Sequence, residues 1–313
     1  MKVFQGFDEL TKIPHPVLTI GTFDGVHLGH QKIIRQLNEV AEAVGGESVL
    51  FTFYPHPRMV LFPDSHNLKL IQTQVEKIDK LNRMGLQNVV VHPFTKEFSR
   101  LSATAFVRDY LVNKLKVKTV VIGYDHQFGK NREGTLELLQ ELSPVYEFDV
   151  IEIGPEDIDE VNVSSTKIRN ALKEGDIERA NNYLGEPFEL SGRVIHGRKV
   201  GKTIGFPTAN IAIENETKII PKQGVYAVTV TSNEKKYTGI LNIGTRPTVD
   251  DSTEPSIEVH ILDFDQEIYD EQLTLQLKWR VRDEHKFENK DALQQQISKD
   301  EQLVRDWMDD ING

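Results

Sequence analysis

Strand-like and helix-like segments alternate along the first 150 residues, and this alternation constrains the fold more than any other feature of the sequence. Short apolar runs typical of buried strands occur at Val17–Phe23, Ser48–Phe53, Asn88–Val91, Thr119–Ile122 and Tyr146–Ile151. Stretches with helical apolar spacing lie between them at Gly29–Val44, Thr73–Arg83, Ala103–Leu115 and Gly134–Leu142. This pattern predicts an α/β fold with a doubly wound parallel sheet, which binds its ligand at the carboxyl ends of the strands.

The pattern changes after Gly185-Glu186-Pro187. Short β-rich pieces separated by turn sequences follow at Phe188–Ile195, Gly224–Val230, Tyr237–Ile243, Ile257–Leu262 and Leu273–Trp279. Such a series predicts a small antiparallel β-barrel domain. A last amphipathic helix has an apolar face made of Leu293, Ile297, Leu303, Val304 and Trp307. With two short helices at Ser165–Leu172 and Ile177–Leu184 closing the first part, we expect domains at 1–185 and 186–313.

Composition narrows the class of protein. The chain has 313 residues, 37 Lys and Arg against 48 Asp and Glu, and a net charge of −11. This acidic excess argues against a nucleic-acid partner. The absence of cysteine rules out disulfides, thiolate metal sites and a cysteine nucleophile. Residues 1–7 lack the apolar core of a signal peptide, and the sequence has no long apolar run. We therefore expect a soluble cytoplasmic protein without a membrane partner. A weak homo-oligomer is left open.

The segment Gly21-Thr22-Phe23-Asp24-Gly25-Val26-His27-Leu28-Gly29-His30 joins a predicted strand to a predicted helix. Backbone N–H groups and the helix dipole make such a junction an anion site, and two imidazoles there suit a reaction that builds charge on phosphorus. A buried structural histidine is an alternative for His27. A zinc site would need further ligands, and His15, His56 and His92 form no compact pattern with this pair.

A second motif, Val163-Ser164-Ser165-Thr166-Lys167-Ile168-Arg169, places three hydroxyls before a predicted helix and two cations in its first turn. Taken alone, it is more typical of a helix cap. Beside the histidine pair, the same groups could hold the phosphates of a nucleotide.

The third motif, Gly205-Phe206-Pro207-Thr208-Ala209-Asn210, lies in the β-rich half. Thr208 and Asn210 are two residues apart on an extended backbone, so both point to one side. Their oxygens are of the kind that Mg²⁺ takes alongside phosphates, although exposed polar residues on a strand would look the same. The nearby Gly197–Thr203 is not a P-loop, because His196 stands where the first glycine is required.

These motifs together resemble a known family. Gly29 flanked by His27 and His30 resembles the first signature of the nucleotidylyltransferase superfamily, and Ser164–Arg169 resembles its second. Pro207–Asn210 resembles the signature of riboflavin kinases. Over essentially its whole length the sequence resembles the bacterial bifunctional riboflavin kinase/FMN adenylyltransferases. The resemblance implies phosphorylation of riboflavin to FMN, followed by adenylyl transfer from ATP to FMN, which gives FAD and pyrophosphate.

The resemblance also implies roles in the first half. His27, His30 and Arg169 would be catalytic. The implied ATP and phosphate contacts are Gly21, Phe23, Asp24, Gly29, Ser164, Ser165 and Thr166. Asp125 and Phe128, in the loop Gly123–Gly129, would contact the flavin.

In the second half, the resemblance makes Glu258 the catalytic base and Thr208 and Asn210 the ligands of Mg²⁺ bound with ATP. The implied nucleotide-loop residues are Gly197, Gly201 and Lys202, and the implied flavin contacts are Arg282 and Phe287. Trp279 and Trp307 are expected in the core rather than against the flavin. The expected small-molecule partners are riboflavin, FMN, FAD and ATP.

Overall fold

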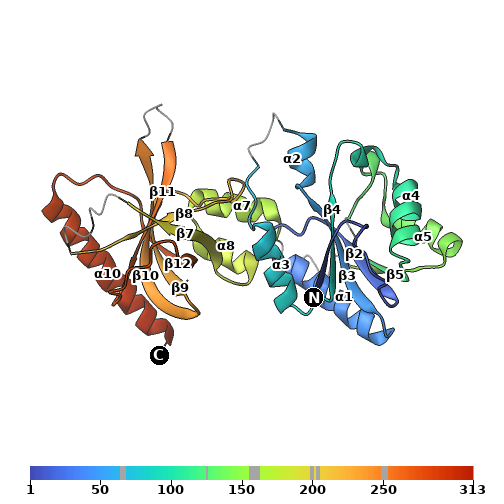
Figure 1. Ribbon diagram of the computed structural model, residues 1–313, viewed down its shortest axis with the longest axis horizontal. Helices are drawn as coiled ribbons and strands as arrows, with labels where there is room; N and C mark the ends of the chain where they lie inside the picture. Colours follow the sequence, from blue (N-terminus) through green and yellow to red (C-terminus); the bar gives the residue numbers. More distant parts are fainter. Residues whose placement is uncertain are drawn as a thin grey trace. The chain divides into compact units, whose positions relative to one another are not determined.

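The computed structural model confirms a parallel sheet in the first part of the chain (Figure 1). Its strands are β1 (Lys2–Gln5), β2 (Pro16–Ile20), β3 (Glu47–Tyr54), β4 (Asn88–Pro93), β5 (Thr119–Gly123) and β6 (Asp149–Ile153). They lie in the order β1-β4-β3-β2-β5-β6, and every neighbouring pair is parallel. The predicted doubly wound sheet is therefore correct.

The structure describes residues 1–63, 68–124, 126–154, 163–197, 201, 205–247 and 253–312. The predicted site residues Asp125 and Lys202 lie outside these ranges. Within them the chain divides into two compact units, Met1–Ser165 and Thr166–Gly313. Each unit has its own core and is described by itself.

Helices cover both faces of the sheet in the first unit (Figure 1). Its helical segments are α1 (Leu28–Ala43), α2 (Pro57–Leu61), α3 (Gln74–Arg83), α4 (Ala103–Phe106) with its continuation η2 (Val107–Lys114), and α5 (Leu136–Tyr146). One core joins the sheet to α1 and α3 through Ile34, Leu37 and Leu81. The other joins it to α4, η2 and α5 through residues such as Phe106 and Leu139.

The order of the strands places the point where the winding reverses beside β2. From β2 the chain proceeds to β3 and β4 on one side, whereas β5 and β6 lie on the other. Ligands of open α/β sheets bind where the winding reverses, at the carboxyl ends of the strands. The segment Gly21–His30 follows β2 at this point, and Gly123–Gly129 follows the neighbouring β5. The fold therefore brings the first predicted site to the position that such folds use.

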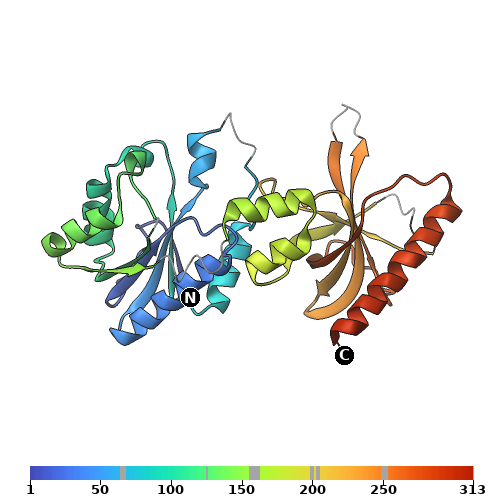
Figure 2. The same cartoon turned by 180° about the vertical axis from the view of Figure 1, so that it is seen from behind.

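The second unit is a closed six-stranded barrel with helices (Figure 2). Its elements are α7 (Ser165–Glu174), α8 (Ile177–Leu184), β7 (Phe188–Ile195), β8 (Ala209–Ala212), β9 (Gly224–Ser232), β10 (Lys235–Pro247), β11 (Thr253–Ile261), β12 (Gln272–Arg282) and α10 (Lys290–Asn312). The strands close in the order β10-β11-β8-β7-β12-β9, all antiparallel. Fully buried side chains such as Leu190, Tyr226 and Val259 fill the interior.

Helix α10 packs on the outside of the barrel. Val304 lies against a cluster that includes Val225, Ala227 and Ile240, and the Trp279 and Trp307 rings stack with centroids 6.0 Å apart. Both tryptophans therefore pack together, as expected. The prediction that Leu303 lies on the apolar face of this helix is wrong, because Leu303 is 49% exposed.

One boundary and two short strands differ from the sequence-based expectation. Helix α5 continues to Tyr146, so β6 begins at Asp149 rather than at Tyr146. The short strands β1 and β8 were not predicted as strands. Helices α7 and α8 belong to the compact unit that contains the barrel. The Asn181 side chain makes this connection, bonding the Leu277 carbonyl and the Phe188 N–H.

Candidate active sites

The first site begins at the N-terminus of α1. His27 is the N-cap residue, and its Nδ1 accepts a hydrogen bond from the His30 N–H at 3.4 Å. Nδ1 of His27 is the acceptor in this bond, which leaves Nε2 to face a ligand as a donor. The first turn of α1 carries no acidic residue. The positive end of the helix dipole is therefore available to an anion.

His30 lies in the middle of an aromatic stack. Its ring centroid is 3.6 Å from that of His27 and 4.5 Å from that of Phe23. Burial, followed by the charges of His27, Lys80 and Lys77, lowers the pKa of His30 well below its usual value. Its Nδ1 is buried and has no hydrogen-bond partner among the described residues. His30 is therefore a neutral imidazole at neutral pH, with polar capacity left for a ligand.

The loop before α1 has an unusual backbone. Phe23, Gly25 and Val26 have positive φ angles of 50°, 89° and 37°. Positive φ costs energy for Phe and more for β-branched Val, and such conformations concentrate at functional sites. Gly21 is required for a different reason, because an added Cβ would lie 2.8 Å from the Phe23 ring. The loop is shaped to bring Phe23 against His30.

Hydrogen bonds from several elements hold this loop. The Asp24 carboxylate accepts the Ile71 N–H at 3.0 Å and the Gln72 N–H at 3.3 Å. Ser165 Oγ donates to the Asp24 carbonyl at 2.9 Å, and Gln31 Nε2 donates to the Val26 carbonyl at 2.9 Å. Asp24 therefore anchors the loop, and the second motif meets the first through Ser165.

The remaining residues of the second motif are on or beside α7. Ser164 precedes the helix, and Thr166 lies in its first turn. Arg169 is buried, with 7% of its surface exposed. Thr166 and Arg169 belong to the second compact unit, whereas Ser164 and Ser165 belong to the first.

Phe128 lies in the core of the first unit. Its ring is 8% exposed, its centroid is 5.6 Å from that of Phe106, and a Cβ on Gly134 would meet it at 2.6 Å. Its backbone also pairs with Gly134 in both directions. The predicted flavin contact of Phe128 stays a prediction.

The second site lies on one face of the barrel. Glu258 of β11 stands directly opposite Asn210 of β8 on one side and Asn242 of β10 on the other. Residues directly opposite each other in antiparallel strands share a face. Asn242 is in turn opposite Val225, which packs against α10. The predicted base and one predicted metal ligand thus share the barrel face that α10 partly covers.

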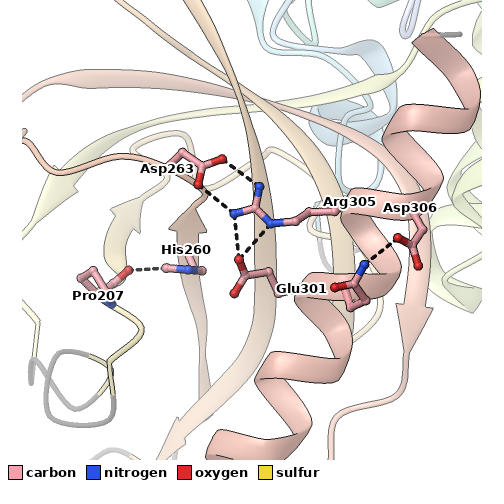
Figure 3. A network of polar contacts seen from close by, with 7 residues as sticks. Pro207, His260, Asp263, Glu301, Arg305 and Asp306 are labelled. Atoms are coloured by element: carbon pink, nitrogen blue, oxygen red, sulfur yellow. Dashed lines mark hydrogen bonds and ion pairs between the residues drawn. The ribbon is translucent and has the colours of Figure 1, made fainter.

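Two hydrogen bonds position these groups. Ser256 Oγ donates to Glu258 Oε1 at 3.0 Å, two residues along the same strand. The His260 ring Nδ1 lies 2.7 Å from the Pro207 carbonyl (Figure 3). Since a carbonyl only accepts, Nδ1 carries the proton. His260 therefore fixes the backbone immediately before Thr208.

The two predicted nucleotide-loop glycines, Gly197 and Gly201, lie beside the predicted metal ligands Asn210 and Thr208 and form what we call the glycine cradle. An added Cβ on Gly197 would lie 2.0 Å from the Asn210 side-chain nitrogen. One on Gly201 would lie 2.2 Å from the Phe206 carbonyl and 3.3 Å from Thr208 Oγ1. A side chain at either position would collide with these atoms, so the glycines let the loop backbone pack closely against the two predicted metal ligands. The residues present therefore suit a hard cation with its phosphate ligands.

Arg282 is held at the end of β12. Its guanidinium bonds both Asp300 oxygens at 2.8–3.0 Å and lies 5.7 Å from the Phe287 ring centroid. Nearby, a Cβ on Gly244 would meet a Glu284 carboxylate oxygen at 2.3 Å. The structure thus brings the segment that follows β12, which contains both predicted flavin contacts, against β10.

Sequence reasoning missed three residues that support these sites: Lys77, Ser256 and Asp300. Lys77 is a buried lysine on α3 that bonds the Thr22 carbonyl. Ser256 shares a strand face with Glu258, and this i, i+2 spacing was a usable signal. Asp300 looks like one more acidic residue on the polar side of an amphipathic helix.

Comparison with known families matches each half of the chain to a family. A family model described as FAD synthetase matches residues 11–167, and one described as riboflavin kinase matches residues 184–308. A curated relative from Listeria monocytogenes, named bifunctional riboflavin kinase/FMN adenylyltransferase, is 42% identical over 95% of this chain and 94% of its own length. This chain belongs to the bifunctional riboflavin kinase/FMN adenylyltransferase family.

Other members of the family are similar. Relatives of the same name from Bacillus subtilis and Escherichia coli are 39% and 37% identical, over 91% and 98% of this chain and 90% and 98% of theirs. A solved structure titled as a macrolide-efflux protein from Streptococcus pneumoniae superposes with a TM-score of 0.89 at 32% identity, covering 97% of this chain and 98% of that one. Within the described part of this chain, every helix is too short or too polar to span a membrane.

Proposed function

We propose that the barrel unit phosphorylates riboflavin to FMN and that the first unit transfers an adenylyl group from ATP to FMN. The observation that carries this proposal is that each unit has its own set of phosphate-handling groups. The first has two stacked imidazoles at a helix N-terminus. The second has a carboxylate directly opposite an amide on a barrel face.

In adenylyl transfer, a phosphate oxygen of FMN attacks the α-phosphorus of ATP, and the bond to the β-phosphate breaks to release pyrophosphate. The nucleophile is already an anion, so no general base is required. The two imidazoles, His27 and His30, and the N-terminus of α1 donate hydrogen bonds to the charge that develops on the phosphates. We assign Ser164 and Ser165 to the phosphates on the strength of the second signature, Ser165 through its backbone N–H at the start of α7 because its hydroxyl donates to the Asp24 carbonyl. We retain Thr166 and Arg169 as phosphate ligands on the strength of the second signature alone.

In riboflavin phosphorylation, the oxygen of the ribityl 5′-hydroxyl attacks the γ-phosphorus of ATP, and ADP leaves. Glu258 accepts the proton of that hydroxyl. Thr208 and Asn210 hold Mg²⁺, which when bound with ATP neutralises phosphate charge. Ser256 orients the Glu258 carboxylate through its hydrogen bond. Because Gly197 and Gly201 have no side chain, the backbone of the nucleotide loop can lie directly against the two metal ligands and the segment before them.

The flavin contacts complete the proposal. We assign Arg282 and Phe287 to riboflavin at the barrel, and Asp125 and Phe128 to FMN at the first site. Lys202 belongs to the nucleotide loop of the barrel. We expect this enzyme to act on small molecules in the cytoplasm.

The test is to incubate the purified chain with riboflavin and Mg-ATP and to separate the flavins by chromatography over time. We expect FMN to appear first and FAD to follow. A chain that forms neither product would overturn the proposal. A chain that forms FMN but does not convert added FMN to FAD would overturn the assignment of the first unit.

A further inference from the structure

Lys77 is a buried lysine beside the first site that the mechanism above does not use. Only 6% of its surface is exposed. Its Nζ donates to the Thr22 carbonyl at 3.1 Å and to the Thr52 hydroxyl at 3.2 Å. The Thr52 hydroxyl is itself 3.3 Å from the Thr22 carbonyl, so the three groups form a closed triangle. Burying an ammonium group whose hydrogen bonds go to a carbonyl and a hydroxyl rather than to a carboxylate is costly, which points to a specific role.

Thr22 directly precedes Phe23, so the contact between Lys77 and the Thr22 carbonyl affects the conformation of Phe23. The Thr22 carbonyl and the Phe23 N–H belong to one planar peptide unit, so fixing that carbonyl fixes the peptide from which Phe23 turns to its φ of +50°. The Phe23 ring then stacks on His30. A bond to the Thr22 carbonyl therefore acts on the orientation of the imidazole.

Lys77 also acts through its charge. Burial lowers its own pKa to about 8, against the opposing effect of Asp24. Burial is the main cause of the lowered pKa of His30, and the charges of His27, Lys80 and Lys77 act in the same direction. The positive charge is thus within interaction range of the imidazole that faces phosphate, in surroundings that screen it poorly.

We propose that Lys77 is a positioning residue for adenylyl transfer. Its ammonium holds the Thr22 peptide, thereby places Phe23 against His30, and keeps a fixed positive charge beside the phosphate site. This inference rests on the adenylyl transfer proposed above. Lys77 touches neither substrate nor the reacting atoms; it acts through the loop and through His30.

The variant Lys77→Met keeps the volume of the side chain and removes the charge and the donors. We expect kcat/KM for conversion of FMN to FAD to fall about 10- to 100-fold, since small displacements of positioned groups cost this much. Phosphorylation of riboflavin by the same molecules should be unchanged. Thr52→Val removes one partner and keeps the ammonium, and we expect a loss of less than about 10-fold.

A second readout separates positioning from general damage. In NMR titrations, the pKa of His30 should rise in Lys77→Met and stay unchanged in Thr52→Val. Lys80→Met removes another buried cation from the same helix, so it should also raise the pKa of His30 while reducing adenylyl transfer less than Lys77→Met. Equal losses in the two lysine variants would assign the effect to charge alone and overturn the positioning role.

Different results would overturn the proposed adenylyl transfer and the proposed role of Lys77. Wild-type protein that does not convert FMN to FAD would overturn the proposed function. Active wild-type protein together with an equally active Lys77→Met variant would overturn the role of Lys77 and leave the proposed function standing.

Discussion

Glu258 of β11 faces Asn210 of β8 directly across neighbouring strands, and the Ser256 hydroxyl holds the Glu258 carboxylate at 3.0 Å. Strand ladders fix the positions of their side chains more firmly than loops do. The proposed base and the proposed metal ligand are therefore held at a constant separation on one face of the barrel.

The Ser256 hydrogen bond can be tested by Ser256→Ala. Loss of the bond frees the Glu258 carboxylate to rotate, so we expect kcat for riboflavin phosphorylation to fall roughly 5- to 10-fold, equivalent to about 1 kcal/mol. Steady-state kinetics with riboflavin and Mg-ATP measures this. Ser232→Ala is a matched control, because Ser232 is a buried barrel serine that bonds Glu271 instead. Unchanged kcat in Ser256→Ala would contradict the positioning role.

The glycine cradle can be tested by Gly197→Ala. The new methyl group would lie 2.0 Å from the Asn210 side chain and must displace it. We expect kcat/KM for ATP in the kinase reaction to fall at least about 10-fold, with FMN adenylylation unaffected. Gly154→Ala is the control, since a Cβ there meets nothing within 4 Å. A fully active Gly197→Ala kinase would show that the space beside Asn210 is not used.

The pairing of Arg282 with Asp300 joins the end of β12 to α10. Asp300 is 1% exposed and also accepts a hydrogen bond from Gln296. Asp300→Asn leaves a largely buried guanidinium without its counter-charge, so we expect about 3 kcal/mol of destabilisation and a higher KM for riboflavin. Tryptophan fluorescence follows this unfolding, because Trp279 and Trp307 pack together in the same unit. An unchanged unfolding midpoint would contradict the expectation.

The acid sensitivity of the first unit can be tested at His92. Burial among aromatic rings, aided by the charge of Lys114, lowers the pKa of His92 to about 4. Between pH 6.5 and pH 4 the unfolded chain therefore binds a proton that the folded chain does not, so the free energy of unfolding falls as the pH falls. His30 contributes in the same direction.

We expect His92→Phe to reduce this decline and to leave stability at pH 7 equal or higher, because His92 Nδ1 is buried without a partner among the described residues. Urea unfolding monitored by circular dichroism at pH 7 and pH 5 measures the effect. Both tryptophans of the chain lie in the barrel unit, so the fluorescence transition is the control and should not move. An unchanged pH dependence of the first unit would contradict the assignment.

The sequence predicted the architecture well because both halves follow simple periodic patterns. The parallel sheet and the barrel agree with the alternation of apolar residues. Strand β8 was missed because it has only four residues and follows a proline turn. Leu303 was misplaced because a long surface helix has apolar residues at its margins.

The candidate sites were predictable to the extent that motifs carry them. The histidine pair and Asn210 came from short signatures, and Glu258 came from the resemblance to the family. Their supports did not, because a buried lysine such as Lys77 is recognisable only from the three-dimensional contacts that compensate its charge. Asp24 is similar: its type suggested a role near phosphate, whereas its carboxylate accepts backbone N–H groups of Ile71 and Gln72.

The central claim is that one chain holds two separate phosphate-transfer sites. The most direct test compares His30→Ala and Glu258→Gln for flavin products from riboflavin and from FMN. We expect Glu258→Gln to lose FMN formation by about 10²-fold or more and to convert added FMN to FAD at the wild-type rate. His30→Ala should accumulate FMN and form FAD about 10²-fold more slowly. Folded variants that each lose both activities would contradict the claim.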